Sequence, residues 1–352
     1  MSRFFSKRYD ALVPYVPGEQ PRDQKYVKLN TNESPFPPSE KAVKRASELA
    51  KSLELYSDPE CTALVRTFAE TYGIERDQVV FGNGSDEILN FAFMAFCDED
   101  HPAAFPDITY GFYPVFAELN RIPYEEIPLK DDLTIDVSEY LGLKKTIFIA
   151  NPNAPTGIAL PLAEIEKILK TNPDNVVVID EAYVDFGGES AVKLINDYDN
   201  LLVVQTFSKS RSLAGARLGM GIGSQKLIAD LQTLRYSTNP YNVNRMTEAA
   251  GIGALEDQAY TLKNARTIME NRAWTAEQLK DLGFEMTDSK ANFLFAKSIK
   301  IGGEELYLKL KERGVLIRHF TKERIKEYNR ITIGSKEQME ILIGKIKEIL
   351  GE

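Results

Sequence analysis

The sequence predicts an α/β fold, in which helices flank a mainly parallel central sheet, together with a second, smaller α+β domain. Three observations predict it. Short apolar runs without polar alternation recur through most of the chain, and segments with helical periodicity lie between them. Near Tyr260 this pattern gives way to a long charged helical stretch. Continuous apolar runs are typical of strands buried on both faces, and alternation of strands with helices favours a parallel sheet.

The first helix is predicted to begin after Ser39, because serine is a favoured N-cap residue. Its apolar face would consist of Ala42, Val43, Ala46, Leu49, Ala50 and Leu53. Four apolar runs then predict strands of the central sheet, at Gln78–Phe81, Thr146–Ala150, Val176–Ile179 and Leu201–Val204. A helix over Leu162–Leu169 would separate two of these strands.

The C-terminal part of the chain predicts a long helix that ends before Gly283 and two further strands, at Ala291–Phe295 and Val315–Ile317. Ser335 and Gln338 predict a capping box at the start of a last helix. The apolar stripe of that helix would be Met339, Leu342, Ile343, Ile346, Ile349 and Leu350. We therefore expect an N-terminal arm over residues 1–40 that joins the small domain, a large domain over 41–255 and the small C-terminal domain over 256–352.

Composition excludes several classes of function. A formal net charge of -9 without a basic stripe argues against nucleic acid as a partner. No apolar run reaches the roughly 18 residues of a membrane span. Cys61 and Cys97 are predicted to be buried and reduced, as in a cytoplasmic protein. His101 and His319 are too few for a histidine-rich metal site, so no metal is expected.

Three polar constellations follow predicted strands, and open α/β sheets bind ligands at the carboxyl ends of their strands. Gly82–Glu87 combines small residues with the start of a helix, which presents free N–H groups to an anion. Asp180–Tyr183 places a carboxylate at a strand end, where it could bind a metal, cap a helix or pair with a cationic heterocycle. Thr206–Lys209 is followed by Arg217. Together they suit one cofactor with a ring nitrogen, an aldehyde and a phosphate.

These segments carry a resemblance to a known family. Asn151-Pro-Asn-Ala-Pro-Thr-Gly157, Asp180-Glu-Ala-Tyr183 and Ser208-Lys-Ser-Arg-Ser-Leu-Ala-Gly-Ala-Arg217 resemble the signature blocks of fold-type-I pyridoxal-phosphate aminotransferases. Within that group the chain resembles the histidinol-phosphate aminotransferases. The pointers are Pro14-Tyr-Val-Pro-Gly18, Leu29-Asn-Thr-Asn-Glu-Ser-Pro35, Gly82-Asn-Gly-Ser-Asp-Glu87 and Pro240-Tyr-Asn-Val-Asn244. The resemblance covers essentially the whole chain.

The resemblance implies a role for each matching residue. Lys209 would form a Schiff base with pyridoxal 5'-phosphate and then move the substrate proton. Asp180 would keep the ring nitrogen protonated, and Tyr183 would bond the ring oxygen. The other residues implied in cofactor binding are Gly84, Ser85, Asp86, Tyr110, Asn153, Thr206, Ser208, Arg217 and, from a neighbouring subunit, Tyr56. Those implied in substrate binding are Tyr15, Asn32, Arg318 and Arg330, whose guanidinium groups suit carboxylate or phosphate.

One position departs from the family pattern. The family usually has asparagine immediately before Pro-Thr-Gly, where it bonds the same ring oxygen as the tyrosine, and this chain has Ala154. Either Asn153 takes over that bond or Tyr183 acts alone. Gly219, Gly221 and Gly223 have the wrong spacing for a dinucleotide-binding loop and predict close strand packing instead.

The resemblance implies a cytoplasmic homodimer with shared active sites that exchanges an amino group between histidinol phosphate and 2-oxoglutarate. An aromatic-amino-acid aminotransferase is the related alternative, since its pocket must also accept an aromatic ring. A threonine-phosphate decarboxylase has nearly the same sequence blocks but catalyses a different class of reaction. A cofactor-binding regulator without activity is disfavoured by Lys209, because binding alone needs no group that moves a proton.

Overall fold

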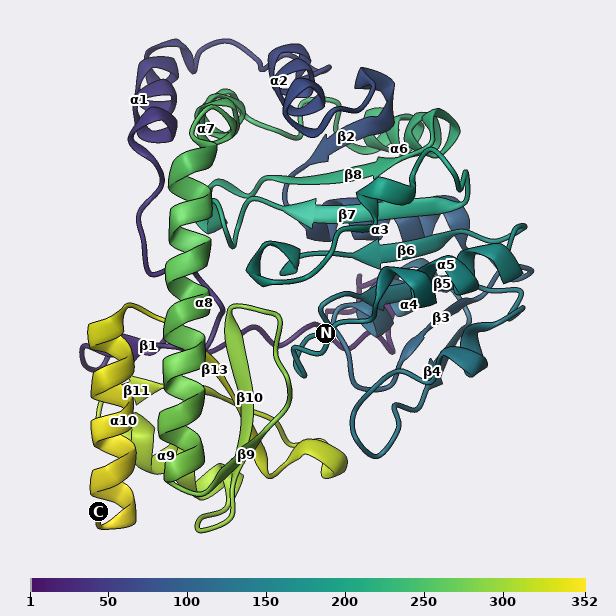
Figure 1. The fold of residues 1–352 in the computed structure, drawn as a ribbon. Helices are drawn as coiled ribbons and strands as arrows, with labels where there is room; N and C mark the ends of the chain where they lie inside the picture. Colours follow the sequence, from purple (N-terminus) through teal and green to yellow (C-terminus); the bar gives the residue numbers. More distant parts are fainter. Residues whose placement is uncertain (1) are drawn as a thin grey trace.

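The computed structural model describes residues 2–352, which form a large and a smaller sheet with helices packed around both (Figure 1). The large sheet has the strand order β2-β8-β7-β6-β5-β3-β4. In that order its strands are β2 (Val79–Gly82), β8 (Gly219–Gly223), β7 (Leu201–Thr206), β6 (Val177–Asp180), β5 (Thr146–Ala150), β3 (Ala103–Pro106) and β4 (Tyr124–Ile127). All neighbours pair in parallel except β8, which is antiparallel to both β2 and β7. The predicted fold class is therefore confirmed, with one reversed strand.

Helices cover both faces of this sheet because successive strand residues point to opposite faces. Ile147 and Ile149 of β5 belong to one buried cluster, whereas Phe148 and Ala150 belong to the other. The first face packs against α2 (Thr62–Tyr72), α5 (Leu162–Thr171) and α7 (Arg245–Leu255). The second packs against α3 (Ser85–Phe96), α4 (Tyr113–Asn120) and α6 (Gln225–Thr238). Helix α1 (Glu40–Leu49) lies along α7.

The smaller sheet is joined to the large one by α8 (Gln258–Asp281), the long helix that runs between them in Figure 1. This sheet is antiparallel, in the order β12 (Arg318–His319), β13 (Tyr328–Thr332), β10 (Phe293–Ser298) and β9 (Phe284–Met286). Helices α9 (Gly303–Glu312) and α10 (Lys336–Leu350) pack beside it. Strand β1 (Val27–Lys28) of the N-terminal arm pairs in parallel with β11 (Val315–Leu316). The predicted domain bounds themselves stay a prediction.

Most of the predicted elements exist in the structure, with ends shifted by a few residues. The four predicted strands of the central sheet are fully buried. Ser39 caps α1, and the capping box of Ser335 with Gln338 is present at α10. Both cysteines are free and buried, as expected. No helix within residues 2–352 is long and apolar enough to cross a membrane.

The reversal of β8 brings distant loops to one edge of the sheet. The carboxyl ends of β2, β6 and β7 lie at the same edge as the amino end of β8, where Gly219 pairs with Gly82 of β2 and Thr206 of β7. The loop after β2 therefore meets the loop that joins β7 to β8. Gly219 permits this contact, because a Cβ atom there would overlap the backbone of Gly84 and Ser85. The close strand packing predicted for this glycine is confirmed.

Candidate active site

A cavity of about 550 Å³ opens at this edge of the large sheet, and residues of the N-terminal arm and the smaller sheet complete its lining. Thirteen of the sixteen site residues that the sequence predicted line it. They are Tyr15, Asn32, Ser85, Asp86, Tyr110, Asp180, Tyr183, Thr206, Ser208, Lys209, Arg217, Arg318 and Arg330. Gly84, Asn153 and Tyr56 are outside the lining. The chain thus brings together residues that are up to about 300 positions apart.

Lys209 lies just beyond the end of β7, in the turn that the hydroxyl group of Thr206 stabilises. The backbone N–H of Ser208 donates to that hydroxyl oxygen at 3.1 Å. The Nζ atom of Lys209 donates to the carbonyl oxygen of Thr31 at 3.3 Å and lies 5.7 Å from the centre of the Tyr183 ring. No carboxylate pairs with this amino group within residues 2–352. An amine so placed, facing a cavity, is available for covalent chemistry.

Asp180, the last residue of β6, is a buried carboxylate at the floor of the cavity. The hydroxyl group of Tyr113 donates to its Oδ2 atom at 2.9 Å, and the N–H of Ala182 donates to Oδ1 at 3.3 Å. Burial raises the pKa of the Asp180 carboxyl to about 6, because the charged form loses solvation. Burial also raises the pKa of the Tyr113 hydroxyl. A cation next to Oδ1 would restore the ionised carboxylate, so this atom suits a protonated heterocycle.

The anion-binding part of the cavity is formed by the start of α3 and by Arg217. Gly84, the residue before α3, has a φ of 88°, a conformation that glycine adopts without strain. Its missing side chain leaves room for Arg217, whose guanidinium group would overlap a Cβ atom at this position. The free N–H groups of a helix start and a nearby guanidinium together form a phosphate site.

Asp86, the second residue of α3, ties two predicted site residues together. Its Oδ2 atom accepts a hydrogen bond from Arg217 at 2.9 Å, and its Oδ1 atom accepts one from the hydroxyl group of Tyr110 at 2.8 Å. The pKa of Tyr110 is raised well above its ordinary value, by burial first and by Asp86 second. Asp86 therefore holds both side chains at the edge of the cavity.

The opposite side of the cavity carries two arginines that form no ion pair with a carboxylate in the described part of the chain. Arg318 of β12 and Arg330 of β13 are direct partners in the antiparallel register. Arg330 donates to the carbonyl oxygen of Asn30 at 3.1 Å, and Arg318 lies 3.5 Å from two carbonyl oxygens of the arm. Burial lowers the pKa of the Arg330 guanidinium, and the charge of Arg318 lowers it further. Like charges on opposed residues are destabilising, so this pair favours a bound anion.

Consecutive residues of the N-terminal arm contact three functional side chains. The carbonyl of Asn30 accepts from Arg330, the carbonyl of Thr31 accepts from Lys209, and the amide group of Asn32 donates to the hydroxyl of Tyr183 at 2.9 Å. Nearer the N-terminus, the Tyr15 ring stacks on Phe112 with centroids 4.3 Å apart. The arm therefore closes one side of the cavity with both polar and aromatic groups.

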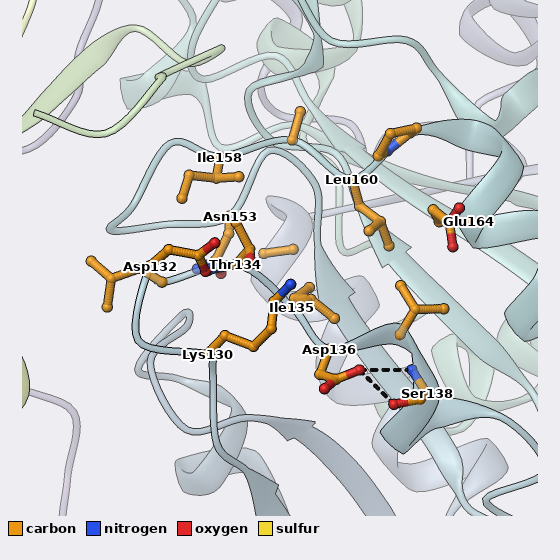
Figure 2. A pocket seen from close by; sticks show the side chains of 15 residues that line it. Lys130, Asp132, Thr134, Ile135, Asp136, Ser138, Asn153, Ile158, Leu160 and Glu164 are labelled. Atoms are coloured by element: carbon orange, nitrogen blue, oxygen red, sulfur yellow. Dashed lines mark hydrogen bonds between the residues drawn. The ribbon is translucent and has the colours of Figure 1, made fainter.

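Asn153 was predicted to compensate for Ala154, and the geometry does not support this role. Its Oδ1 atom accepts from Thr109 at 2.8 Å, and its Nδ2 atom donates to Ile108 and Thr156 at 3.0 Å each. Figure 2 shows Asn153 in the lining of a second cavity, of about 470 Å³, instead of the first. Both N–H groups of this amide are used, so it has none left to donate to a ligand in the first cavity. Ala154 lines that cavity in its place.

Tyr56 lies at the surface, away from the cavity lining of its own chain. Its side chain is 77% exposed and stacks on Tyr241, with ring centroids 4.5 Å apart. Leu53 and Leu55 beside it are also exposed. An exposed apolar group of this kind, formed by Leu53, Leu55, Tyr56 and Tyr241, is typical of a protein interface.

Sequence reasoning missed several residues of the site. Tyr113 follows Tyr110 in an aromatic run that could have drawn attention to it, because Tyr110 was itself a predicted site residue. Phe320 lies 5.9 Å from the guanidinium carbons of both Arg318 and Arg330 and forms part of the lining. Thr31 contributes through its backbone, for which a sequence carries no signal.

Comparisons with known proteins agree with this geometry. The profile of the family "Aminotransferase class I and II" matches residues 24–346. A histidinol-phosphate aminotransferase from Brachyspira hyodysenteriae is 49% identical over 352 residues, which cover 99% of each chain. One from Clostridium botulinum is 45% identical and covers 100% of both chains.

Solved structures show the same fold. The histidinol-phosphate aminotransferase of Sinorhizobium meliloti in complex with pyridoxal-5'-phosphate superposes with a TM-score of 0.89 at 21% identity, covering 100% of this chain and 98% of that one. The enzyme of Clostridium acetobutylicum gives a TM-score of 0.84 at 23% identity, with coverages of 92% and 99%. With full-length relatives above 40% identity and a matching family profile, the chain belongs to the aminotransferase class I and II family, among the histidinol-phosphate aminotransferases.

Proposed function

We propose that the chain is a pyridoxal-phosphate-dependent enzyme that exchanges an amino group between histidinol phosphate and 2-oxoglutarate. The products would be imidazole-acetol phosphate and glutamate. The observation that carries the proposal is the pair Arg318 and Arg330, which face each other in the cavity that also holds Lys209 and form no ion pair with a carboxylate within residues 2–352. Both substrates are anions with two separated polar ends, and two adjacent guanidinium groups can bind them.

The residues of the cavity fit pyridoxal phosphate. Asp180 offers a buried Oδ1 atom that lacks a cation, and a protonated ring nitrogen supplies one. Gly84 leaves room for the Arg217 guanidinium beside the start of α3, and this combination of a cation with free N–H groups suits the phosphate. The free amine of Lys209 suits the aldehyde. Ser85, Ser208 and Arg217 would hold the phosphate, with Tyr110 against the ring.

The bound cofactor supplies an aldehyde that captures the substrate amino group and a ring that accepts electrons from the adjacent carbon. Asp180 keeps the proton on the ring nitrogen, where it strengthens that acceptance. The Nζ atom of Lys209 would take the proton from the substrate carbon and give it back when the amino group has been transferred. The hydroxyl group of Tyr183 would donate a hydrogen bond to the ring oxygen.

The two arginines would divide the charged ends of the substrates between them. Arg330 would bind the α-carboxylate of glutamate and of 2-oxoglutarate. Histidinol phosphate has a phosphorylated hydroxymethyl group at that position, so its phosphate lies beyond the place of the α-carboxylate. Arg318, the direct neighbour of Arg330 in the sheet, would bind this phosphate and, in the other half-reaction, the distal carboxylate of glutamate. Tyr15 and Phe320 would contact the imidazole ring, since aromatic rings line this side of the cavity.

Steady-state kinetics with three amino donors would test the substrate assignment. Histidinol phosphate should give the highest kcat/KM with 2-oxoglutarate as acceptor. A higher value for phenylalanine would favour an aromatic aminotransferase, which the ring of Tyr15 stacked on Phe112 could also serve. Carbon dioxide release from threonine phosphate, without consumption of 2-oxoglutarate, would instead indicate a decarboxylase.

The proposal includes a homodimer in which Tyr56 reaches the cofactor phosphate of the other subunit. Support comes from the exposed group of Leu53, Leu55, Tyr56 and Tyr241, which would be buried in such an interface. We also place the enzyme in the cytoplasm, since its two thiols are free and buried.

A further inference from the structure

Ala154 leaves an apolar surface where the family usually has a hydrogen-bond donor. Its side chain is buried and packs with Ala291, Phe293 and the ring of Tyr183. The neighbouring amide of Asn153 is fully engaged in other bonds. The loop of residues 151–157 therefore gives no side-chain amide to this side of the cavity.

The N-terminal arm supplies an amide at the same tyrosine. The Nδ2 atom of Asn32 lies 2.9 Å from the hydroxyl oxygen of Tyr183, across 151 positions of sequence. Asn32 is buried and lines the cavity. This contact is the one hydrogen bond to the Tyr183 hydroxyl among side chains within residues 2–352.

Asn32 is held rigidly enough to orient that hydroxyl group. Its backbone N–H donates to Oγ1 of Thr332 at 3.0 Å, and its carbonyl accepts from Asn292 at 3.0 Å. The Thr332 hydroxyl donates in turn to Oδ1 of Asn32 at 2.9 Å. The φ of Asn32 is 57°, in the left-handed region that asparagine tolerates better than most residues.

These bonds favour one orientation of the amide group. The Thr332 hydroxyl accepts the N–H of Asn32 and has its own hydrogen left to donate, and Oδ1 of Asn32 is the acceptor beside it. The Nδ2 atom is thereby turned toward Tyr183, and the tyrosine oxygen accepts. The hydrogen of the Tyr183 hydroxyl then remains available for an acceptor inside the cavity.

We infer that Asn32 is a positioning residue that acts through Tyr183: its amide holds the Tyr183 hydroxyl as a donor to the ring oxygen of the cofactor. The inference rests on the proposed function. Thr332 and Arg330 lie two positions apart on β13, so their side chains share one face of the strand. The strand that carries the carboxylate-binding arginine therefore also anchors the residue that orients Tyr183.

The test uses Asn32→Gly, because glycine keeps the left-handed backbone conformation and removes only the amide. The readout is the pH midpoint at which the absorption band of the bound cofactor titrates. A hydrogen bond to the ring oxygen favours the form in which that oxygen carries more negative charge, so weakening it raises the midpoint. We expect a rise of about half to one pH unit, the equivalent of one ordinary hydrogen bond.

A double-mutant comparison separates this role from a structural one. In the Tyr183→Phe background, Asn32→Gly should add no further shift, because the group through which it acts is absent. Ser34→Ala is the matched control: it removes a contact of the same arm with Ser212, and the midpoint should stay unchanged. An equal shift in both backgrounds, or none in either, would overturn the inference.

The same titration distinguishes the inference from the proposed function. It needs the cofactor but no amino donor, so a wrong choice of substrate leaves its result intact. A normal cofactor band in the wild type, with an Asn32→Gly midpoint equal to it, would overturn the role of Asn32 alone. A wild-type protein that binds no pyridoxal phosphate would overturn both.

Discussion

The two sides of the active-site cavity differ in how their charges are balanced. On the side formed by the large sheet, Arg217 pairs with Asp86, and Asp180 accepts hydrogen bonds from Tyr113 and Ala182. On the side formed by the arm and the smaller sheet, Arg318 and Arg330 donate to backbone carbonyls and form no ion pair within residues 2–352. The first arrangement suits a cofactor that stays bound, whereas the second suits anions that enter and leave in each half-reaction.

Removal of Lys209 should produce the largest effect, because it is the only group on the large-sheet side proposed to change its bonds during the reaction. Lys209→Ala should lose turnover by about a thousandfold or more, within the range for a general base that also binds covalently. The wild-type protein should be yellow and bleach with borohydride, and the variant should bind cofactor without a bleachable band. Lys193→Ala, at an exposed lysine, is the control. Wild-type rates in Lys209→Ala would remove this residue from the mechanism.

The second largest effect is expected for Asp180→Asn, on the free energy of unfolding, and it tests how far the protein stabilises the charge of the Asp180 carboxylate. The folded-state pKa of about 6 lies above the ordinary 3.8, so the folded protein binds this proton more tightly than the unfolded chain. The cost of the buried charge is absent below pH 3.8, grows as the pH rises to 6 and is complete above it. Without cofactor, Asp180→Asn should therefore raise the free energy of unfolding by about 2 to 3 kcal/mol at pH 8.

Urea unfolding of the cofactor-free proteins at pH 8 and pH 5 measures this difference. The gain from Asp180→Asn should be smaller at pH 5, where the wild-type carboxyl is largely protonated. Asp230→Asn, at an exposed aspartate of α6, serves as a comparison for general charge effects. A gain of the same size at both pH values would mean that it does not come from the charge of Asp180, and no gain at either pH would mean that the protein already stabilises this charge.

Arg318→Ala probes the opposite side and should have a selective effect. It should weaken the binding of histidinol phosphate by about 2 kcal/mol, as expected for a charge-assisted bond to phosphate. Phenylalanine carries no phosphate and should lose much less. KM values for the two donors, with Arg313→Ala as a surface control, would measure the difference. Equal losses of affinity for the two donors would show that Arg318 does not bind the phosphate. They would favour an aromatic-amino-acid aminotransferase.

The smallest effect is expected at Tyr56, which does not line the active-site cavity of its own chain. Tyr56→Phe removes only the hydroxyl group and should weaken cofactor binding by about 1 kcal/mol, the value of one hydrogen bond. Light scattering of the wild type should give twice the chain mass of 39.6 kDa. A fully active monomer would contradict the shared site, and Tyr236→Phe, another exposed tyrosine, is the control.

The large-sheet side could be predicted from sequence because its residues follow buried strands. Asp180 and Lys209 each come at or just after the end of an apolar run, and parallel strands bring such ends to one edge. The reversed strand β8 could not be predicted in this way, because a five-residue run with alternate glycines has no directional signal.

The arm side depends on pairings between distant segments. That Arg318 faces Arg330 follows from the register of β12 and β13, which sequence spacing does not determine. Asn32 was predicted as a substrate ligand, and its contact with Tyr183 depends on how the arm docks. The choice of Asn153 relied on its adjacency to Ala154, but neighbouring loop residues can face different cavities.

The close contact at Gly219 limits which residue this position can accept in engineered variants and in related sequences. Even a methyl group there would overlap the backbone of Gly84 and Ser85, so no rotamer change could relieve it. A library that varies the anion-binding loop can therefore diversify Ser85 or Arg217 but must keep position 219 constant. Among distant relatives, a side chain at this position would mark sequences in which the first turn of α3 has moved, whatever their other motifs.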